Sequence, residues 1–174
     1  MNIQIELISE SDLADESFNI VIDGLKPREI YRVEMFLSDY YCINAPMLLA
    51  HDVLWKSTAT FVSDTNGIIN ISQTPSCSGS YEGISTMGLF FNAKPLTNKR
   101  KKLPNSLSKI PLLDHFFVGI KIMQGNTVIA ERTFTRHYMS SQISHQDIYG
   151  KHFQGRLFYD KKAIKTPSID YCER

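Results

Sequence analysis

The stretch Gly79–Pro95 (GSYEGISTMGLFFNAKP) has glycines and serines at spacings close to those of the turn around a hydrolase nucleophile. That turn follows the pattern G-x-S-x-G, and it places the serine between a strand and a helix, beside oxyanion donors. Gly79 and Gly83 have the required separation, but Tyr81 stands between them. A second register beginning at Gly83 ends on methionine. We therefore predict no nucleophile and no following helix, and interpret the glycines as a turn that lets two strands pack closely.

The histidines and acidic residues form no known metal or catalytic motif. No two histidines have H-x-H or H-x-x-x-H spacing, and the acidic run near the N-terminus lacks the D-x-D-x-D-G pattern of a calcium loop. No P-loop or dinucleotide-binding glycine pattern is present. We predict no catalytic residue, no cofactor and no metal site. The alternative is an independent enzyme site assembled by tertiary contact from His137, His145 and acids. The histidines are His51, His115, His137, His145 and His152, and the acidic run contains Glu10, Asp12, Asp15 and Glu16.

Length and charge exclude several classes of protein. The 174 residues, 43% hydrophobic and 21% charged, suit one packed domain with tails. A net charge of +1 provides no field that would steer the chain toward nucleic acid or an anionic membrane. The basic run NKRKK lies in the polar, proline-bounded stretch Pro95–Pro111, which we interpret as a solvated loop. No apolar run approaches the ~18 residues of a membrane-spanning helix. We predict no nucleic-acid partner and no membrane partner.

The three cysteines, Cys42, Cys77 and Cys172, match no zinc or redox spacing. The sequence begins MNIQIELISESDLADE, which has neither the basic nor the apolar region of a secretory signal. We therefore expect reduced thiols in a cytoplasmic protein. One disulfide with one free thiol is the alternative.

Apolar residues recur mainly with period two, which predicts strands. Trp55, Ala59 and Phe61 share one face of their segment, and the run His115–Met123 is joined by QGN to a second alternating run, which predicts a hairpin. After QGN, Val128, Ala130 and Phe134 are in phase. The expected strands are Ile3–Ile8, Phe18–Ile22, Glu29–Leu37, Leu54–Val62, Ile68–Ser72, Leu89–Ala93, His115–Met123, Thr127–Tyr138 and Arg156–Tyr159.

Eight or nine short strands with turn signals between them predict an all-β fold, an antiparallel β-sandwich of immunoglobulin-like type. Trp55 is expected in the core. The longest helix candidate is weak and lies around Ala45–Val53. Lys161–Arg174 has no period and is expected to be a partly disordered tail.

Four blocks of the sequence resemble the acyl-CoA thioesterase and bile-acid-CoA:amino-acid N-acyltransferase family. IDGLKP (Ile22–Pro27) is similar to that family's GL-x-P, and Leu54–Ile71 is similar to its W-x-S-x-A-x-(F/Y)-x-A-D-x-x-G block. Gly79–Pro95 resembles G-S-Y-x-G-(V/I)-x-P-M-G-L-x-W-S-M-x-P, which is the most specific block. Gly155–Ile169 is similar to the start of the family's next domain.

The sequence departs from the family pattern at three places. Thr86 stands where the family favours proline, and Phe91-Asn92-Ala93 replaces the usual W-S-M. An insertion lies around Asp39–His51.

The resemblance implies an immunoglobulin-like N-terminal domain followed by an α/β-hydrolase domain that carries the nucleophile, acid and histidine. We expect residues 1–154 to form the sandwich and residues 155–174 to begin a hydrolase domain that is otherwise truncated or missing. No catalytic residue is carried over. Met87, Leu89 and Phe90 are candidates to pack in the core or against the catalytic domain.

Two functions from different classes follow. The first is a non-catalytic module that supports an α/β-hydrolase domain in cis or in trans, so that acyl-CoA is a partner only in the full-length context. The second is a stand-alone β-sandwich module that recruits a separate partner or binds an acyl ligand, for which the insertion and the basic loop are the evidence. Open edge strands and an uncovered apolar face also favour a homo-oligomer.

Overall fold

The computed structural model describes residues 2–40, 53–96, 114–151 and 153–162. The chain divides into two units, residues 1–138 and 139–174. The predicted helix around Ala45–Val53, the loop Pro95–Pro111, the insertion and the tail lie wholly or mostly outside the described residues, as do Cys42 and Cys172. Cys77 is an exposed free thiol.

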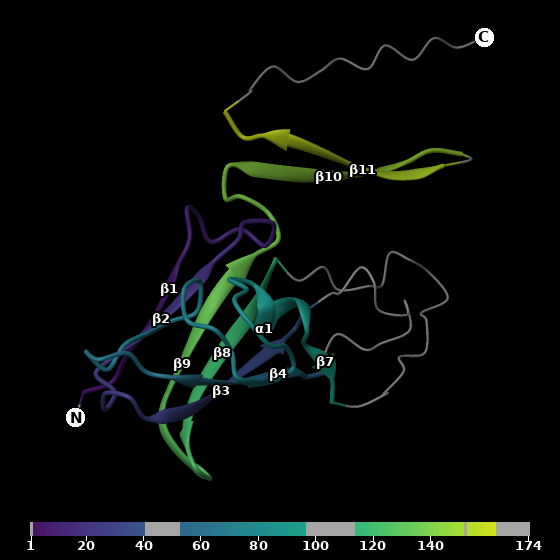
Figure 1. The fold of residues 1–174 in the computed structure, drawn as a ribbon. Helices are drawn as coiled ribbons and strands as arrows, with labels where there is room; N and C mark the ends of the chain where they lie inside the picture. The colour runs from purple at the N-terminus through teal and green to yellow at the C-terminus, as the bar shows by residue number, and fades with distance from the viewer. Residues whose placement is uncertain (1, 41–52, 97–113, 152, 163–174) are drawn as a thin grey trace. The chain divides into compact units, whose positions relative to one another are not determined.

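The first unit is a sandwich of two antiparallel sheets (Figure 1). The smaller sheet has the order β1-β2-β5, and the larger has the order β6-β4-β3-β8-β9 with β7 paired to β4. Side chains from both sheets form one core. This confirms the all-β antiparallel fold class, and two facing sheets are consistent with the immunoglobulin-like type. The strands are β1 Gln4–Ile8, β2 Asn19–Asp23, β3 Ile30–Ser38, β4 Trp55–Val62, β5 Ile69–Asn70, β6 Ser78–Gly79, β7 Lys94–Pro95, β8 His115–Gln124 and β9 Thr127–His137.

Apolar and polar residues alternate in the central strands because each of these strands buries one of its two faces. In β4 the predicted inner residues, including Trp55 and Phe61, are buried, whereas the residues between them are partly exposed. Val33 at the centre of β3 is fully buried and pairs with Ala59 of β4 and Ile122 of β8. Burying a Val, Leu, Ile or Phe side chain contributes about 1.5–3 kcal/mol, so each inward-facing apolar residue of these strands stabilises the sheet.

The predicted hairpin is present as β8 and β9, which are joined at Gln124 and Thr127 by a two-residue turn. A register shift between Ile122 and Met123 interrupts the ladder. Beyond this shift, Val128 is 45% exposed, although its sequence phase matches the more buried Phe134. The bulge thus explains why the inward face predicted for β9 does not extend to its start.

Arg136, near the end of β9, is the largest polar side chain of the core, with 1% exposure. Its guanidinium reaches the segment between β1 and β2 and lies 5.2 Å from the ring centre of Phe18. Its Nη1 donates to the Ser9 hydroxyl at 2.9 Å and to the Ser11 carbonyl at 2.8 Å, and its Nη2 donates to the carbonyls of Leu13 and Glu16. A buried charge is tolerated when it is hydrogen-bonded in this way.

The acidic run of the N-terminal segment surrounds this guanidinium. Burial lowers the pKa of Arg136, and the carboxylates of Asp12, Glu16 and Asp15 oppose that shift. The same segment is held by main-chain bonds, from Ala14 N–H to the His137 carbonyl and from His137 N–H to the Asp12 carbonyl, each 2.7 Å. The acids therefore balance a buried arginine, a role that the sequence analysis did not anticipate.

The second unit contains a two-stranded antiparallel ribbon of β10 (Ile143–Tyr149) and β11 (Gln154–Asp160). The predicted strand at Arg156–Tyr159 is confirmed within β11, whereas β10 was not predicted because Ser144, His145 and Gln146 obscure its alternation. Arg156 binds the Asp147 carboxylate across the ribbon through Nε at 2.6 Å and Nη2 at 2.9 Å. The expected domain boundary at residue 154 coincides with the first residue of β11, and β11 pairs with β10.

The predicted strand Leu89–Ala93 is wrong. Residues Gly88–Phe91 form a short helix, α1, and the strand β7 begins only at Lys94. A strand would place Leu89 and Phe91 on the same face, but in a helix they point about 200° apart. Leu89 is accordingly 1% exposed and Phe91 is 75% exposed. No helix in the described part of the chain is long and apolar enough to cross a membrane.

Replacing Arg136 with methionine should lower the free energy of unfolding by about 3 kcal/mol or more, because buried carbonyls and a hydroxyl lose their donor. Urea unfolding followed by circular dichroism measures this change. Lys121→Met is the matched control, since Lys121 pairs with Glu131 at 3.4 Å on the surface of the same sheet. The control should cost less than about 1 kcal/mol. Equal effects of the two variants would contradict a structural role for the buried guanidinium.

Candidate functional site

The stretch Gly79–Pro95 begins where β6 lies against β4. Gly79 has φ +124°, and a Cβ there would lie 2.3 Å from the Thr58 carbonyl oxygen. Only glycine permits this approach of two strands. The interpretation of Gly79 as a close-packing residue is therefore confirmed. The prediction that no helix follows is wrong, because the short helix α1 begins at Gly88.

Tyr81, which occupies the central position of the tested nucleophile pattern, packs its ring over Gly88. A Cβ at Gly88 would lie 2.5 Å from Cζ of Tyr81. The Tyr81 hydroxyl donates to the Ser85 carbonyl at 3.5 Å. Burial raises the pKa of Tyr81 to about 12, so the phenol stays protonated at neutral pH and serves as a packing group rather than a nucleophile.

The residues predicted to contact either the core or a second domain lie in and beside α1. Leu89 is buried in the core, while Met87 and Phe90 are partly buried and pack against it. The main-chain N–H of Phe18 donates to the Met87 sulfur at 3.3 Å. Phe90 meets the rings of Phe18, Tyr40 and Phe116 at centroid distances of 5.7, 5.3 and 6.3 Å. Contact of these residues with another domain stays a prediction.

Phe91 is the apolar residue of this turn that the sequence analysis missed. It is 75% exposed, beside Phe90, whose ring centre lies 5.9 Å away. Ile84, in the loop before α1, is 61% exposed. The signal that could have found Phe91 is the run Leu-Phe-Phe, because three consecutive large apolar residues cannot all face one core in either a strand or a helix.

The histidines of the alternative enzyme site have separate partners. His137 Nε2 lies 3.6 Å from Oδ2 of Asp12, and His115 Nδ1 is hydrogen-bonded to Asp114, which lowers the pKa of that carboxyl. His145 belongs to the second unit, where its ring lies 6.1 Å from that of Phe158. Within the described ranges, no three histidine, cysteine or acidic side chains are arranged to hold a metal ion.

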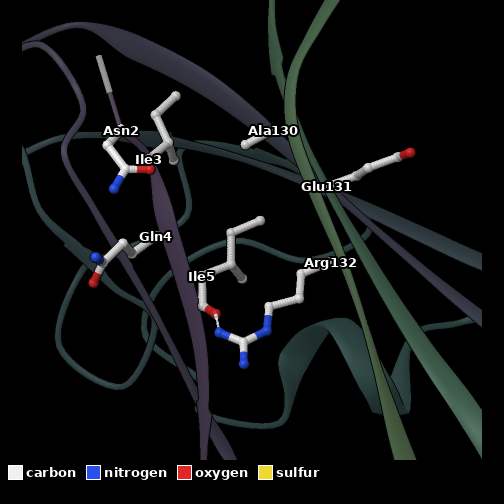
Figure 2. Close-up of a pocket in the computed structure, with 7 residues that line it drawn as sticks. All are labelled: Asn2, Ile3, Gln4, Ile5, Ala130, Glu131 and Arg132. Carbon is white, nitrogen blue, oxygen red and sulfur yellow. Dashed lines mark hydrogen bonds between the residues drawn. The ribbon is translucent and has the colours of Figure 1, made fainter.

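A cleft of about 370 Å³ opens between β1 and β9. The two strands are the edges of different sheets, so their outer sides face each other without a strand between them. Figure 2 shows Ile3, Ile5 and the guanidinium of Arg132 between the strands, whereas Gln4 and Glu131 point away. Nη1 of Arg132 donates to the Ile5 carbonyl at 2.7 Å. The sequence could not locate this cleft, because alternation does not tell which strands are edges.

Residues 15–149 match the model of the family described as acyl-CoA thioester hydrolase/BAAT N-terminal region. The chain belongs to this family. The match covers the sandwich from just before β2 and ends within the second unit, at the last residue of β10. It confirms the resemblance drawn from the sequence motifs.

Three mouse proteins illustrate the similarity. The chain is 27% identical to acyl-coenzyme A amino acid N-acyltransferase 2 over 112 residues, 64% of this chain and 24% of that protein. It is 22% identical to acyl-coenzyme A thioesterase 6 over 160 residues, 89% of this chain and 35% of that protein. It is 22% identical to bile acid-CoA:amino acid N-acyltransferase over 164 residues, 91% of this chain and 37% of that protein. The chain therefore spans only a minor part of each relative's length.

Gly88→Ala should destabilise the first unit by about 1–3 kcal/mol, because the new methyl group displaces the Tyr81 ring from a packed position. Gly119→Ala in β8 is the matched control, since the nearest atom to its Cβ would be 3.8 Å away, at Phe36. Thermal and urea unfolding of the two variants provide the comparison. A Gly88→Ala protein as stable as Gly119→Ala would show that the ring does not depend on this contact.

The phenol of Tyr81 should ionise near pH 12, above the ordinary value of 10. Spectrophotometric titration at the tyrosinate absorption band measures this pKa, after the titration curve of the Tyr81→Phe variant has been subtracted from that of the unsubstituted protein. The folded state holds the proton more tightly than the unfolded state. This contribution to stability is therefore complete below pH 10 and is lost as the pH rises toward 12. A Tyr81 that titrates at 10 in the folded protein would contradict its burial.

Proposed function

We propose that this chain is the non-catalytic N-terminal module of an acyl-CoA thioester hydrolase or acyltransferase, and that it supports a C-terminal α/β-hydrolase domain. The observation that carries the proposal is the match of residues 15–149 to the N-terminal region of this family. The names of its relatives include both thioesterases and N-acyltransferases. In this proposal the catalytic groups belong to the C-terminal part of such proteins, which this chain does not cover.

The chemistry of Gly79–Pro95 supports a structural role. A thioester hydrolase needs an activated nucleophile within reach of a base. Tyr81 occupies the central position of the tested pattern, and its pKa is raised to about 12, which makes it a poor nucleophile at neutral pH. The glycines of the stretch accommodate close packing instead.

We place the contact with the catalytic domain at the turn that contains α1. Met87 and Phe90 are partly buried, and the adjacent Phe91 adds a large exposed ring. Exposed aromatic rings on a rigid support are typical anchors of an interface. Leu89 contributes indirectly, because its burial fixes the orientation of the turn.

The chain alone should release no thiol from a panel of acyl-CoA thioesters above the rate in buffer. A colorimetric thiol reagent follows the release, and mouse acyl-coenzyme A thioesterase 6 serves as the positive control. A heat-denatured sample of the same preparation controls for contaminants that survive purification. Saturable release that co-purifies with the folded chain would overturn the non-catalytic assignment.

The second candidate is a stand-alone module that binds a separate partner or an acyl ligand. The cleft between β1 and β9 is the observation that favours it. The transcript sequence beyond codon 174 separates the two candidates. A continuing frame with G-x-(S/C)-x-G and a hydrolase pattern supports the first, whereas a stop codon followed by unrelated sequence supports the second.

A further inference from the structure

Two histidines lie opposite each other at the open end of the β8–β9 hairpin. His115 pairs directly with His137 in the ladder, and the centres of their rings are 5.9 Å apart. The main-chain N–H of His137 donates to the Asp12 carbonyl, and the His137 carbonyl accepts from the N–H of Ala14, so the N-terminal segment rather than β8 uses both groups. His115 and His137 therefore form a non-hydrogen-bonded pair, the type of antiparallel pair in which opposite side chains are closest.

Both imidazole rings can be reached from water, and their separation suits a shared ion. The side chains of His115 and His137 are 36% and 39% exposed. The ring of Phe117, two residues further along β8, meets that of His115 edge-on at 5.0 Å and restricts its movement. Two imidazoles that bind one ion with metal–nitrogen distances of about 2.0–2.1 Å have ring centres roughly 5–6 Å apart. The observed separation therefore allows one ion to join the two rings.

Each histidine has a carboxylate beside one of its ring nitrogens. Nδ1 of His115 is hydrogen-bonded to Asp114, and this bond lowers the pKa of that carboxyl. An ionised carboxylate only accepts, so Nδ1 carries the proton and the lone pair of the neutral ring lies on Nε2. At His137 it is Nε2 that lies 3.6 Å from Oδ2 of Asp12, which favours the proton on Nε2 and leaves the lone pair on Nδ1. A carboxylate beside the second nitrogen is typical of histidines that bind metal ions.

Main-chain hydrogen bonds hold both aspartates beside the histidine pair. The N–H of Tyr138 donates to the Asp114 carbonyl at 2.8 Å, and the N–H of His137 donates to the Asp12 carbonyl at 2.7 Å. Both acids are therefore fixed at their backbones to the end of β9. Their carboxylates place negative charge near the rings, which offsets part of the charge of a bound dication.

We propose that His115 and His137 together bind a divalent transition-metal ion of the kind that prefers imidazole, such as Zn²⁺. The two protein ligands are Nε2 of His115 and Nδ1 of His137, and water fills the remaining positions. In the described ranges no three histidine, cysteine or acidic side chains could hold an ion, so the site has two protein ligands. The ion links the ends of β8 and β9, which is a structural role. The inference goes beyond the proposed function, because it needs neither acyl-CoA nor a second domain.

This site differs from the enzyme site considered from the sequence, which combined His137 with His145. His145 belongs to the second unit, where it pairs with Phe158 of β11. His115 and His137 lie on different strands, so their spacing along the chain matches no metal motif. Only the register of the hairpin brings them together.

Isothermal titration of the intact, untagged chain with ZnCl₂ tests the class of ion. MgCl₂ is the comparison, because Mg²⁺ prefers oxygen ligands and would bind to the carboxylates rather than to the imidazoles. We expect saturable binding of Zn²⁺ and much weaker binding of Mg²⁺. No Zn²⁺ binding, or Mg²⁺ that binds as tightly as Zn²⁺, would overturn the proposal.

Substitutions test the location of the site. His115→Gln and His137→Gln should each lower Zn²⁺ affinity by about tenfold or more, because one of only two protein ligands is lost. The double variant should lose little more than either single variant, since one remaining imidazole cannot chelate. His145→Gln is the matched control, because it makes the same change in the second unit, and it should leave the affinity unchanged. Zn²⁺ affinity that survives either single substitution in the hairpin would overturn the assignment.

Electron paramagnetic resonance of the unsubstituted chain covers the case in which a variant fails to fold. Cu²⁺ also prefers imidazole and binds such sites more tightly than Zn²⁺ does, so it serves as the probe at one equivalent. We expect hyperfine splitting from at least two coordinated nitrogens. Coupling to fewer than two nitrogens would overturn the proposal. Because no readout involves acyl-CoA, these outcomes are independent of the thioester assay.

Discussion

The buried guanidinium of Arg136 is the constraint on which the arrangement of the two sheets depends. The segment it holds connects β1, an edge strand of the smaller sheet, to β2, the central strand of that sheet. Arg136 itself belongs to β9, an edge strand of the larger sheet. A charge this deeply buried costs several kcal/mol when it loses its partners, so the carbonyls of the segment must remain close to β9. The main-chain bonds at His137 hold the same segment. The edge of the sandwich is therefore closed at this end by polar contacts rather than by a strand.

Arg132, on the same strand as Arg136, also donates a hydrogen bond from its guanidinium to a main-chain carbonyl of the N-terminal chain. The two arginines are four residues apart, so they share a face of β9 and stand about 14 Å apart along it. Arg136 is sealed by the segment after β1, whereas Arg132 makes a single bond to the Ile5 carbonyl and faces a cleft. The difference follows from the path of the N-terminal chain, which presents several carbonyls to Arg136 and one carbonyl, that of Ile5, to Arg132.

The turn around α1 shows how a sequence motif can be specific without being catalytic. Gly79 allows β6 to lie on β4, Gly88 provides space for the Tyr81 ring, and Leu89 enters the core. Each of these residues has a packing reason, so the motif specifies a shape. That shape presents Phe91 to solvent while it anchors Phe90 among the rings of Phe18, Tyr40 and Phe116. A rigid turn of this kind is consistent with the N-terminal region of the family. The chain covers a minor share of the length of each relative.

From the sequence alone, the alternation of β3, β4 and β8, the turn between β8 and β9, and family membership were all predictable. These features depend on local period, on turn residues and on motifs that lie within short windows of the chain. The tertiary structure alone decided the burial of Arg136, whose partner Ser9 lies 127 positions away. Main-chain carbonyls accept the rest of its hydrogen bonds, and every residue has a carbonyl, so no side-chain pattern marks them. The tertiary structure also decided that Leu89–Phe91 is helical, because the core accommodates the side chain of Leu89 while that of Phe91 is left in solvent. The position of Arg132 at an open edge was likewise a tertiary outcome, since the period of a strand indicates which residues share a face but not which strand lies beside it.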